Sequence, residues 1–188
     1  MIYLIKKGVP PNHSFKIMEK ILKVTDKPVI IDADGLNILA KLNEADEDKQ
    51  SCYPYCLPSN FVVTPHIKEM SRMIAKTTEE IKENLLEYTS KQHTGCTIVL
   101  KDARTVVSDG NTSYINTSGN NGLSTGGSGD VLTGMIAGLT AQKMQPFEAA
   151  KLAVYIHGAA ADEYTSKYSR YSMLASDIID MISEVMPY

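Results

Sequence analysis

The stretch that decides the fold lies at residues 122–134 and reads GLSTGGSGDVLTG. Small residues lead up to Asp130, and an apolar segment follows it. This order predicts a loop that enters a helix at or near Asp130. Backbone amides at a helix start attract anions, and small side chains let a phosphate come close. The plainer alternative is a turn with a helix-capping aspartate, so the flanking sequence has to decide between the two.

Apolar runs upstream of this loop predict strands, and the segments between them predict helices. The runs in PVIIDADG, FVVTPH and CTIVLK are short and end at polar residues, as buried strands do. The segment TVVSDGNTSYIN predicts a hairpin that turns at residues 109–110. Three helices are expected before the loop: over 14–24 with Ser14 as the cap, from Pro65 with Thr64 as the cap, and over 77–93 with a Thr77–Glu80 capping box. Three more are expected after it, over 130–141, 146–164 and 175–185. This alternation predicts one α/β domain over residues 1–188, with three α/β/α layers and a mostly parallel sheet.

The composition excludes several classes of partner. The 188 residues carry a formal net charge of −3, so no basic surface for nucleic acid is expected. Neither a membrane span nor an export signal is expected, and we place the protein in the cytoplasm. Cys52, Cys56 and Cys96 are an odd number of cysteines and no export signal is expected, so we expect reduced thiols. Cys52 and Cys56 could hold a metal, but no second Cys/His pair has metal-ligand spacing.

Polar side chains collect at the carboxyl ends of the predicted strands, where ligands bind in α/β sheets. The residues expected to share this edge are Asp32, Asp34, Thr64, His66 and Lys101. Each also has a plainer interpretation, because strand-end lysines are usually solvated and aspartates often cap helices.

Asp130 and the residues before it suit phosphoryl transfer. The amides of Gly127, Ser128 and Gly129 would hold a phosphoryl donor, and Asp130 would act as general base toward a hydroxyl. No Gly-Lys-Ser/Thr sequence follows, so this is not a Walker loop.

His66 and Glu69 are three residues apart at a predicted helix start, so they share a face. They suit a substrate contact and the water shell of Mg²⁺, or else a helix-start histidine beside a solvated glutamate. We assign no role to His13, His93 and His157, which have no partner at a useful spacing.

Taken together and in order, these segments resemble one family. VIIDADGLNIL, FVVTPHIKEM, TIVLKDARTVVSDG, NTSGNNGLSTGGSGDVLTGMIAGLTAQ, AVYIHGAAAD and YSMLASDIID resemble the ADP/ATP-dependent NAD(P)H-hydrate dehydratases of the ribokinase-like superfamily, from about Pro28 onward. The resemblance implies a ribokinase-like fold and repair of the S epimer of hydrated NADH or NADPH, which carries a hydroxyl on its reduced ring. It also implies that ADP or ATP phosphorylates this hydroxyl after Asp130 removes the proton, so that phosphate can leave.

Carried over residue by residue, the resemblance assigns substrate contacts to His66 and Asp130, catalysis to Asp130, and a water-mediated Mg²⁺ contact to Glu69. The positions it assigns to the nucleotide are Lys101, Asp102, Ala103, Arg104, Thr105, Asn121, Gly122, Leu123, Ser124, Thr125, Gly126, Gly127, Ser128 and Gly129. The family is generally oligomeric, so a homo-oligomer is implied.

The chain departs from the family pattern in three places. TPHIKE stands where the family reads TPHPGE, and LKDART stands where it reads LKGAGT, so Asp102 and Arg104 replace small residues. The segment with a GPGLG-type loop is reduced to KKGVPPN, so we expect a ribokinase-like domain that lacks its N-terminal part. Two alternatives stay open: a small-alcohol kinase of the same superfamily, or a catalytically impaired nucleotide-binding fragment.

Overall fold

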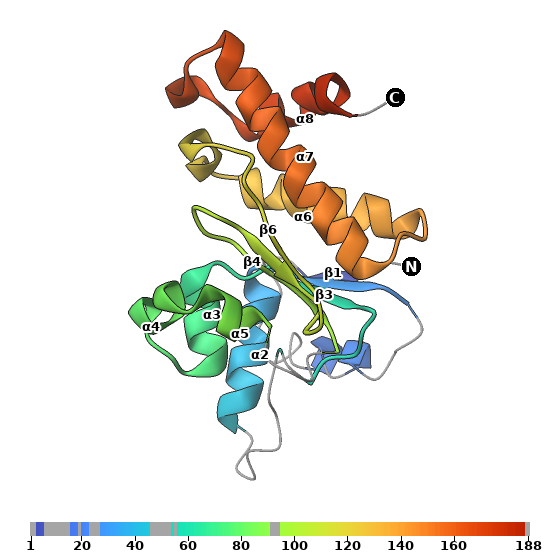
Figure 1. Cartoon of the computed structure of the whole chain (residues 1–188). Coiled ribbons are helices and arrows are strands. Elements are labelled where there is room, and N and C mark those ends of the chain that lie inside the picture. The colour runs from blue at the N-terminus through green and yellow to red at the C-terminus, as the bar shows by residue number, and fades with distance from the viewer. Residues whose placement is uncertain are drawn as a thin grey trace.

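A mixed six-stranded sheet forms the centre of the protein. The computed structural model describes residues 3–5, 16–18, 20–22, 27–45, 54, 56–90 and 95–186. The strands are β1 (Tyr3–Ile5), β2 (Val29–Ile31), β3 (Phe61–Val63), β4 (Thr97–Leu100), β5 (Val106–Ser108) and β6 (Ser113–Ile115), and they lie side by side in chain order. β1 to β4 are parallel, and β5 and β6 add an antiparallel hairpin (Figure 1). The expected mostly parallel sheet is confirmed, and β1 is a strand that we did not predict.

The central strands are apolar because both of their faces are covered. Successive side chains of a strand point to opposite faces. Val29 and Ile31 of β2 therefore pack into one core, whereas Ile30 packs into the other with Val62 and Val99 of the neighbouring strands. Because both faces of these strands are buried, their sequences are short runs of mostly apolar residues.

Helices cover the two faces of the sheet and complete the α/β/α layers (Figure 1). On one face lie α2 (Asp34–Ala45), α3 (Ile67–Ile74), α4 (Thr78–Glu83) and α5 (Leu85–Thr89). On the other lie α6 (Ser128–Ala141) and α7 (Pro146–Lys167), with α8 (Ala175–Val185) packed on α7 and the short 3-10 helices η1 (Asn121–Ser124) and η2 (Arg170–Ser172) nearby. The three helices after the glycine-rich loop are confirmed, with α6 and α7 slightly longer than expected. None of the helices in the described ranges is long and apolar enough to cross a membrane.

The helix predicted from Pro65 begins two residues later, with His66 rather than Thr64 as its N-cap. His66 Nδ1 accepts from the amide of Glu69 at 3.1 Å, and Glu69 Oε2 accepts from the amide of His66 at 2.9 Å. Thr64 is fully buried and its amide donates to Ile31 O, so it continues the extended pairing of β3. The prediction was wrong because this cross-strand bond keeps the backbone extended past Thr64.

The helix predicted over 77–93 is broken at Asn84, whose φ of −135° and ψ of 43° are not helical. The Asn84 side chain donates to Glu80 O at 3.1 Å, a local bond that competes with helix continuation. The Thr77–Glu80 capping box is confirmed. Residues 16–18 and 20–22 are helical as expected, whereas Ser14, His13, Cys52 and residues 91–94 lie outside the described residues.

Two glycines in neighbouring helices should respond oppositely to alanine. A Cβ at Gly158 in α7 would lie 2.7 Å from the carbonyl carbon and oxygen of Ser118, whereas one at Gly138 in α6 would meet nothing within 4 Å. We expect Gly158→Ala to lower the free energy of unfolding by about 2 kcal/mol through overpacking. Gly138→Ala should raise it by up to about 1 kcal/mol, since alanine is the better helix former. Urea unfolding of both variants tests this, and equal stabilities would contradict it.

Candidate active site

A buried carboxylate joins three elements at the carboxyl edge of the sheet. Asp32, directly after β2, is 4% exposed. Lys101, directly after β4, places its Nζ 3.1 Å from Asp32 Oδ1. Thr133 of α6 donates its hydroxyl to Asp32 Oδ2 at 3.0 Å. Burial by itself would raise the pKa of Asp32, but the ammonium and the surrounding hydrogen bonds outweigh it, so the pKa lies below the ordinary 3.8.

The same lysine lies against the start of α6. A Cβ at Gly129 would be 3.5 Å from Lys101 Nζ, so the ammonium sits beside the first turn of that helix. The Lys101 amide also donates to Pro65 O at 2.8 Å, and Lys101 pairs with His66 in a parallel bridge. Asp32, His66 and Lys101 are therefore brought to one edge as expected.

The other two residues expected at this edge have structural positions. Thr64 is buried, and Asp34 lies in the first turn of α2. Helix α2 is also tied to α3, since Asn37 Oδ1 accepts from Arg72 Nη1 at 2.8 Å.

The start of α6 has the form of an anion-binding helix terminus. Its N-cap, Gly127, has a left-handed φ of 90°, a conformation that glycine adopts without strain, and no side chain caps the helix. The first amides of a helix have no partner within it and carry the positive end of its dipole. Asp130 is exposed in this first turn. An anion and a carboxylate base can therefore meet at one place.

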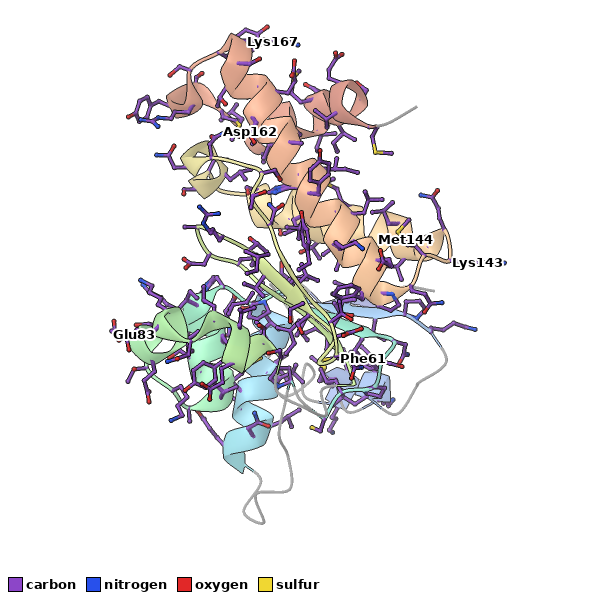
Figure 2. The ribbon with its side chains drawn as sticks, in the orientation of Figure 1. Phe61, Glu83, Lys143, Met144, Asp162 and Lys167 are labelled. Atoms are coloured by element: carbon purple, nitrogen blue, oxygen red, sulfur yellow. The ribbon has the colours of Figure 1, made fainter. Side chains whose placement is uncertain are left out.

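Helix α7 holds the loop that leads into this site. The Asp162 carboxylate accepts from the Gly119 amide at 2.7 Å and from Asn120 Nδ2 at 2.9 Å. Asn120 in turn caps η1 through the Gly122 amide. Figure 2 shows Asp162 on the part of α7 beside the η1 loop. Sequence reasoning missed Asp162, because no local pattern links it to Gly119.

His157 of α7 supports the other end of the loop. It is 6% exposed, and its Nε2 lies 3.0 Å from Ser128 O. Burial lowers its pKa to about 4, and the nearby Lys101 ammonium adds to this against the opposing effect of the Ser128 bond. We assigned His157 no role because the sequence shows no partner at a useful spacing, and its partner in the structure is a backbone carbonyl that no motif reveals.

The residues predicted to line the nucleotide fall into two segments at this edge. Asp102, Ala103 and Arg104 are exposed on the turn after β4, between a half-buried Lys101 and a half-buried Thr105. Residues 121–129 form η1, the loop that follows it and the first two residues of α6, and Gly122 and Ser128 among them are buried. Their contacts to a nucleotide stay predictions.

Glu69 is 8% exposed and takes part in the capping box of α3. A carboxylate oxygen has further lone pairs, so a contact to a metal-bound water still fits. Among the residues that the structure describes, no three His, Cys, Asp or Glu side chains converge as a metal cage. Among the described cysteines, Cys56 and Cys96 form no disulfide. A metal here would depend mainly on ligand phosphates, as Mg²⁺ commonly does.

Known proteins with similar sequences share this arrangement of segments. A family model described as NAD(P)H-hydrate dehydratase matches residues 2–184. The chain belongs to the NAD(P)H-hydrate dehydratase family. It is 38% identical over 177 residues to the bifunctional NAD(P)H-hydrate repair enzyme Nnr of Moorella thermoacetica, covering 90% of this chain and 31% of that protein. It is 42% identical over 141 residues to the ADP-dependent (S)-NAD(P)H-hydrate dehydratase of Neisseria meningitidis, covering 73% of this chain and 46% of that protein.

Solved structures confirm the ribokinase-like fold. The ADP/ATP-dependent NAD(P)H-hydrate dehydratase of Bacillus subtilis, co-crystallised with ATP/Mg²⁺ and soaked with CoA, superposes with a TM-score of 0.80 at 31% identity. The match covers 98% of this chain and 64% of that one. A ribokinase-like superfamily protein of Enterococcus faecalis gives 0.76 at 28% identity, over 97% of this chain and 61% of that one. The chain thus spans less than two thirds of the length of each of these relatives.

The Asp32–Lys101 pair should show strong coupling. Removing one partner leaves a poorly solvated charge, whereas removing both leaves none. In a double-mutant cycle of Asp32→Asn and Lys101→Met, we expect a coupling energy of about 2 kcal/mol in the free energy of unfolding. Additive effects of the two substitutions would contradict the pairing.

His157 should make folding depend on pH. The pKa of the buried ring is about 4 against 6.5 ordinarily, so the unfolded chain binds the proton more readily between these values. Stability should therefore fall as the pH is lowered through this window, with a His157 contribution of about 3 kcal/mol. Urea unfolding of the parent and His157→Gln at several pH values isolates this contribution. Parallel pH profiles of the two proteins would refute it.

Proposed function

We propose that this chain dehydrates the S epimer of hydrated NADH or NADPH and uses ADP or ATP as phosphoryl donor. The observation that carries the proposal is the uncapped start of α6, where exposed Asp130 follows the glycine-rich loop and Lys101 lies alongside. Family membership and the names of the relatives support this substrate and these nucleotides. The chain spans only part of its relatives, so the activity is proposed for this portion of the domain.

The proposed chemistry turns a poor leaving group into a good one. Asp130 takes the proton from the ring hydroxyl, whose oxygen attacks the terminal phosphoryl group and releases AMP or ADP. The carbon–oxygen bond then breaks and phosphate leaves with the electron pair. A proton is lost from the neighbouring ring carbon, which restores the double bond. The amides of the α6 terminus and the Lys101 ammonium stabilise the charge on the transferring group.

The remaining residues bind and orient the two substrates. His66, an exposed residue at the start of α3, contacts the hydrated cofactor. Residues 101–105 and 121–129 line the nucleotide. Glu69 would help to hold Mg²⁺ through water, and the ion would supply positive charge to neutralise part of the phosphate charge. We further propose a single domain that works as a homo-oligomer in the cytoplasm, without nucleic acid or membrane partners.

The alternatives are less well supported. A hydroxyethylthiazole kinase of Pyrococcus horikoshii superposes with a TM-score of 0.54 at 16% identity, covering 99% of this chain and 88% of that one, which supports a shared fold alone. An impaired nucleotide binder would explain the exposed Asp102 and Arg104, where small residues were expected. Neither alternative accounts as well for the combined segments that the family match covers.

Asp130 provides the direct test. The chain is mixed with hydrated NADPH, Mg²⁺ and ADP or ATP, and recovery of the reduced-nicotinamide absorbance is followed. We expect Asp130→Asn to lower kcat by about 10²- to 10⁴-fold, because a general base is lost, while nucleotide affinity stays within about tenfold.

Asp180→Asn, an exposed change in α8, serves as the matched control and should keep full activity. Equal activity of Asp130→Asn would rule out the proposed base. A stable phosphorylated alcohol in place of restored NADPH would favour the kinase alternative.

A further inference from the structure

The first turn of α6 is held from behind by a side chain of α7. His157 Nε2 lies 3.0 Å from Ser128 O, and both residues are buried. A carbonyl oxygen can only accept, so Nε2 carries the proton and donates it. Burial, together with the Lys101 ammonium, lowers the pKa of His157 to about 4, so the ring is neutral and keeps this donor near neutral pH.

This bond sets the direction of an amide that the histidine does not touch. The carbonyl of Ser128 and the amide of Gly129 belong to one planar trans peptide and point in opposite directions. A donor that fixes Ser128 O on the α7 side therefore directs the Gly129 N–H away from α7. Gly129 has no side chain to restrain its own backbone, so the restraint has to come from a neighbour.

The next peptide plane is fixed by a separate contact. The Thr133 hydroxyl lies 2.9 Å from Gly129 O and 3.0 Å from Asp32 Oδ2, so it restrains the plane that carries the Asp130 amide. Consecutive peptide planes at the helix start are thus each held by a buried side chain. His157 is the one that holds the plane nearest the loop.

We propose that His157 is a positioning residue that, through Ser128 O, aims the Gly129 amide at the transferring phosphoryl group. The inference rests on the proposed function and adds a residue that contacts neither substrate. An amide that already points at developing charge stabilises the transition state without reorganisation. A freely rotating peptide at Gly129 would lose this advantage but keep most of the binding surface.

The test compares two substitutions at His157. His157→Phe keeps an aromatic ring but removes the donor, and His157→Gln keeps an amide N–H at a similar reach. We expect His157→Phe to lower kcat by about tenfold, with KM for hydrated NADPH within about twofold. This loss is smaller than the roughly 10²- to 10³-fold loss on removing a transition-state donor, because the Gly129 amide is misdirected rather than removed. His157→Gln should recover most of the lost kcat. If His157→Phe does not fold, His157→Asn, whose shorter amide stops short of Ser128 O, replaces it.

A second readout does not depend on activity. The Val131 amide donates to Gly127 O at 3.1 Å in the same turn, so its hydrogen exchange reports fraying of the helix start. We expect His157→Phe to speed this exchange by about tenfold and His157→Gln to leave it near the parent rate. Thr140→Val removes a buried hydroxyl that donates to Ile136 O in the same helix, and this control should change neither kcat nor Val131 exchange.

The outcomes separate the inference from the proposed function. Unchanged Val131 exchange and kcat in His157→Phe would overturn the inference, as would equal damage in His157→Phe and His157→Gln. If the parent chain restores no NADPH, the proposed function fails. In that case faster Val131 exchange in His157→Phe, recovered in His157→Gln, still upholds the role of His157 in holding the turn.

Discussion

The carboxylate of Asp32 joins β2 to the end of β4 through Lys101 and to α6 through Thr133. These elements lie far apart in the sequence, and the contact fixes where α6 begins relative to the sheet. Burying an ion pair gives little net stability, because the cost of removing both charges from water offsets most of their attraction. The consequence of the pair is therefore mainly geometric. It places a lysine and a helix N-terminus together at the edge of a parallel sheet, where ligands bind.

The proposed anion site consists of backbone amides, so neighbouring elements have to impose its shape. Gly127 supplies the left-handed turn that starts α6 and, as its N-cap, offers the first amides no side-chain hydrogen bond. Helix α7 then holds the loop at both ends, through Asp162 at Gly119 and through His157 at Ser128. A glycine-rich loop gains close approach to phosphate but loses stiffness, and α7 restores that stiffness.

Local patterns predicted most of the fold. The runs that became β2, β3 and β4, the β5–β6 hairpin and the Thr77–Glu80 capping box all depend on residues close in sequence. β1 was not predicted, because its pairing with β2 joins residues that are distant in the sequence. The helix at Pro65 was misplaced for a similar reason, since a bond from Thr64 to Ile31 decides the backbone there.

In the candidate site, too, residues with a local signal could be predicted, whereas residues that act through distant contacts could not. Asp130, Lys101 and the loop glycines stand out in the sequence because their residue types at those positions suit phosphate chemistry. The supports of the loop do not stand out. His157 is 29 residues from Ser128, and Asp162 is 43 residues from Gly119, and each binds a backbone atom that any residue possesses. Only the folded arrangement of α7 beside the loop reveals them.

The central claim is that a nucleotide phosphate binds at the start of α6, and an NMR titration of the isotope-labelled chain with ADP tests it most directly. We expect the largest amide shifts at residues 127–130, with further shifts at 101–105. A cavity of about 420 Å³ between α5 and the β5–β6 hairpin, lined in part by Leu86 and Ile115, offers a different location. Shifts confined to Leu86 and Ile115, with the amides of residues 127–130 unmoved, would contradict the claim.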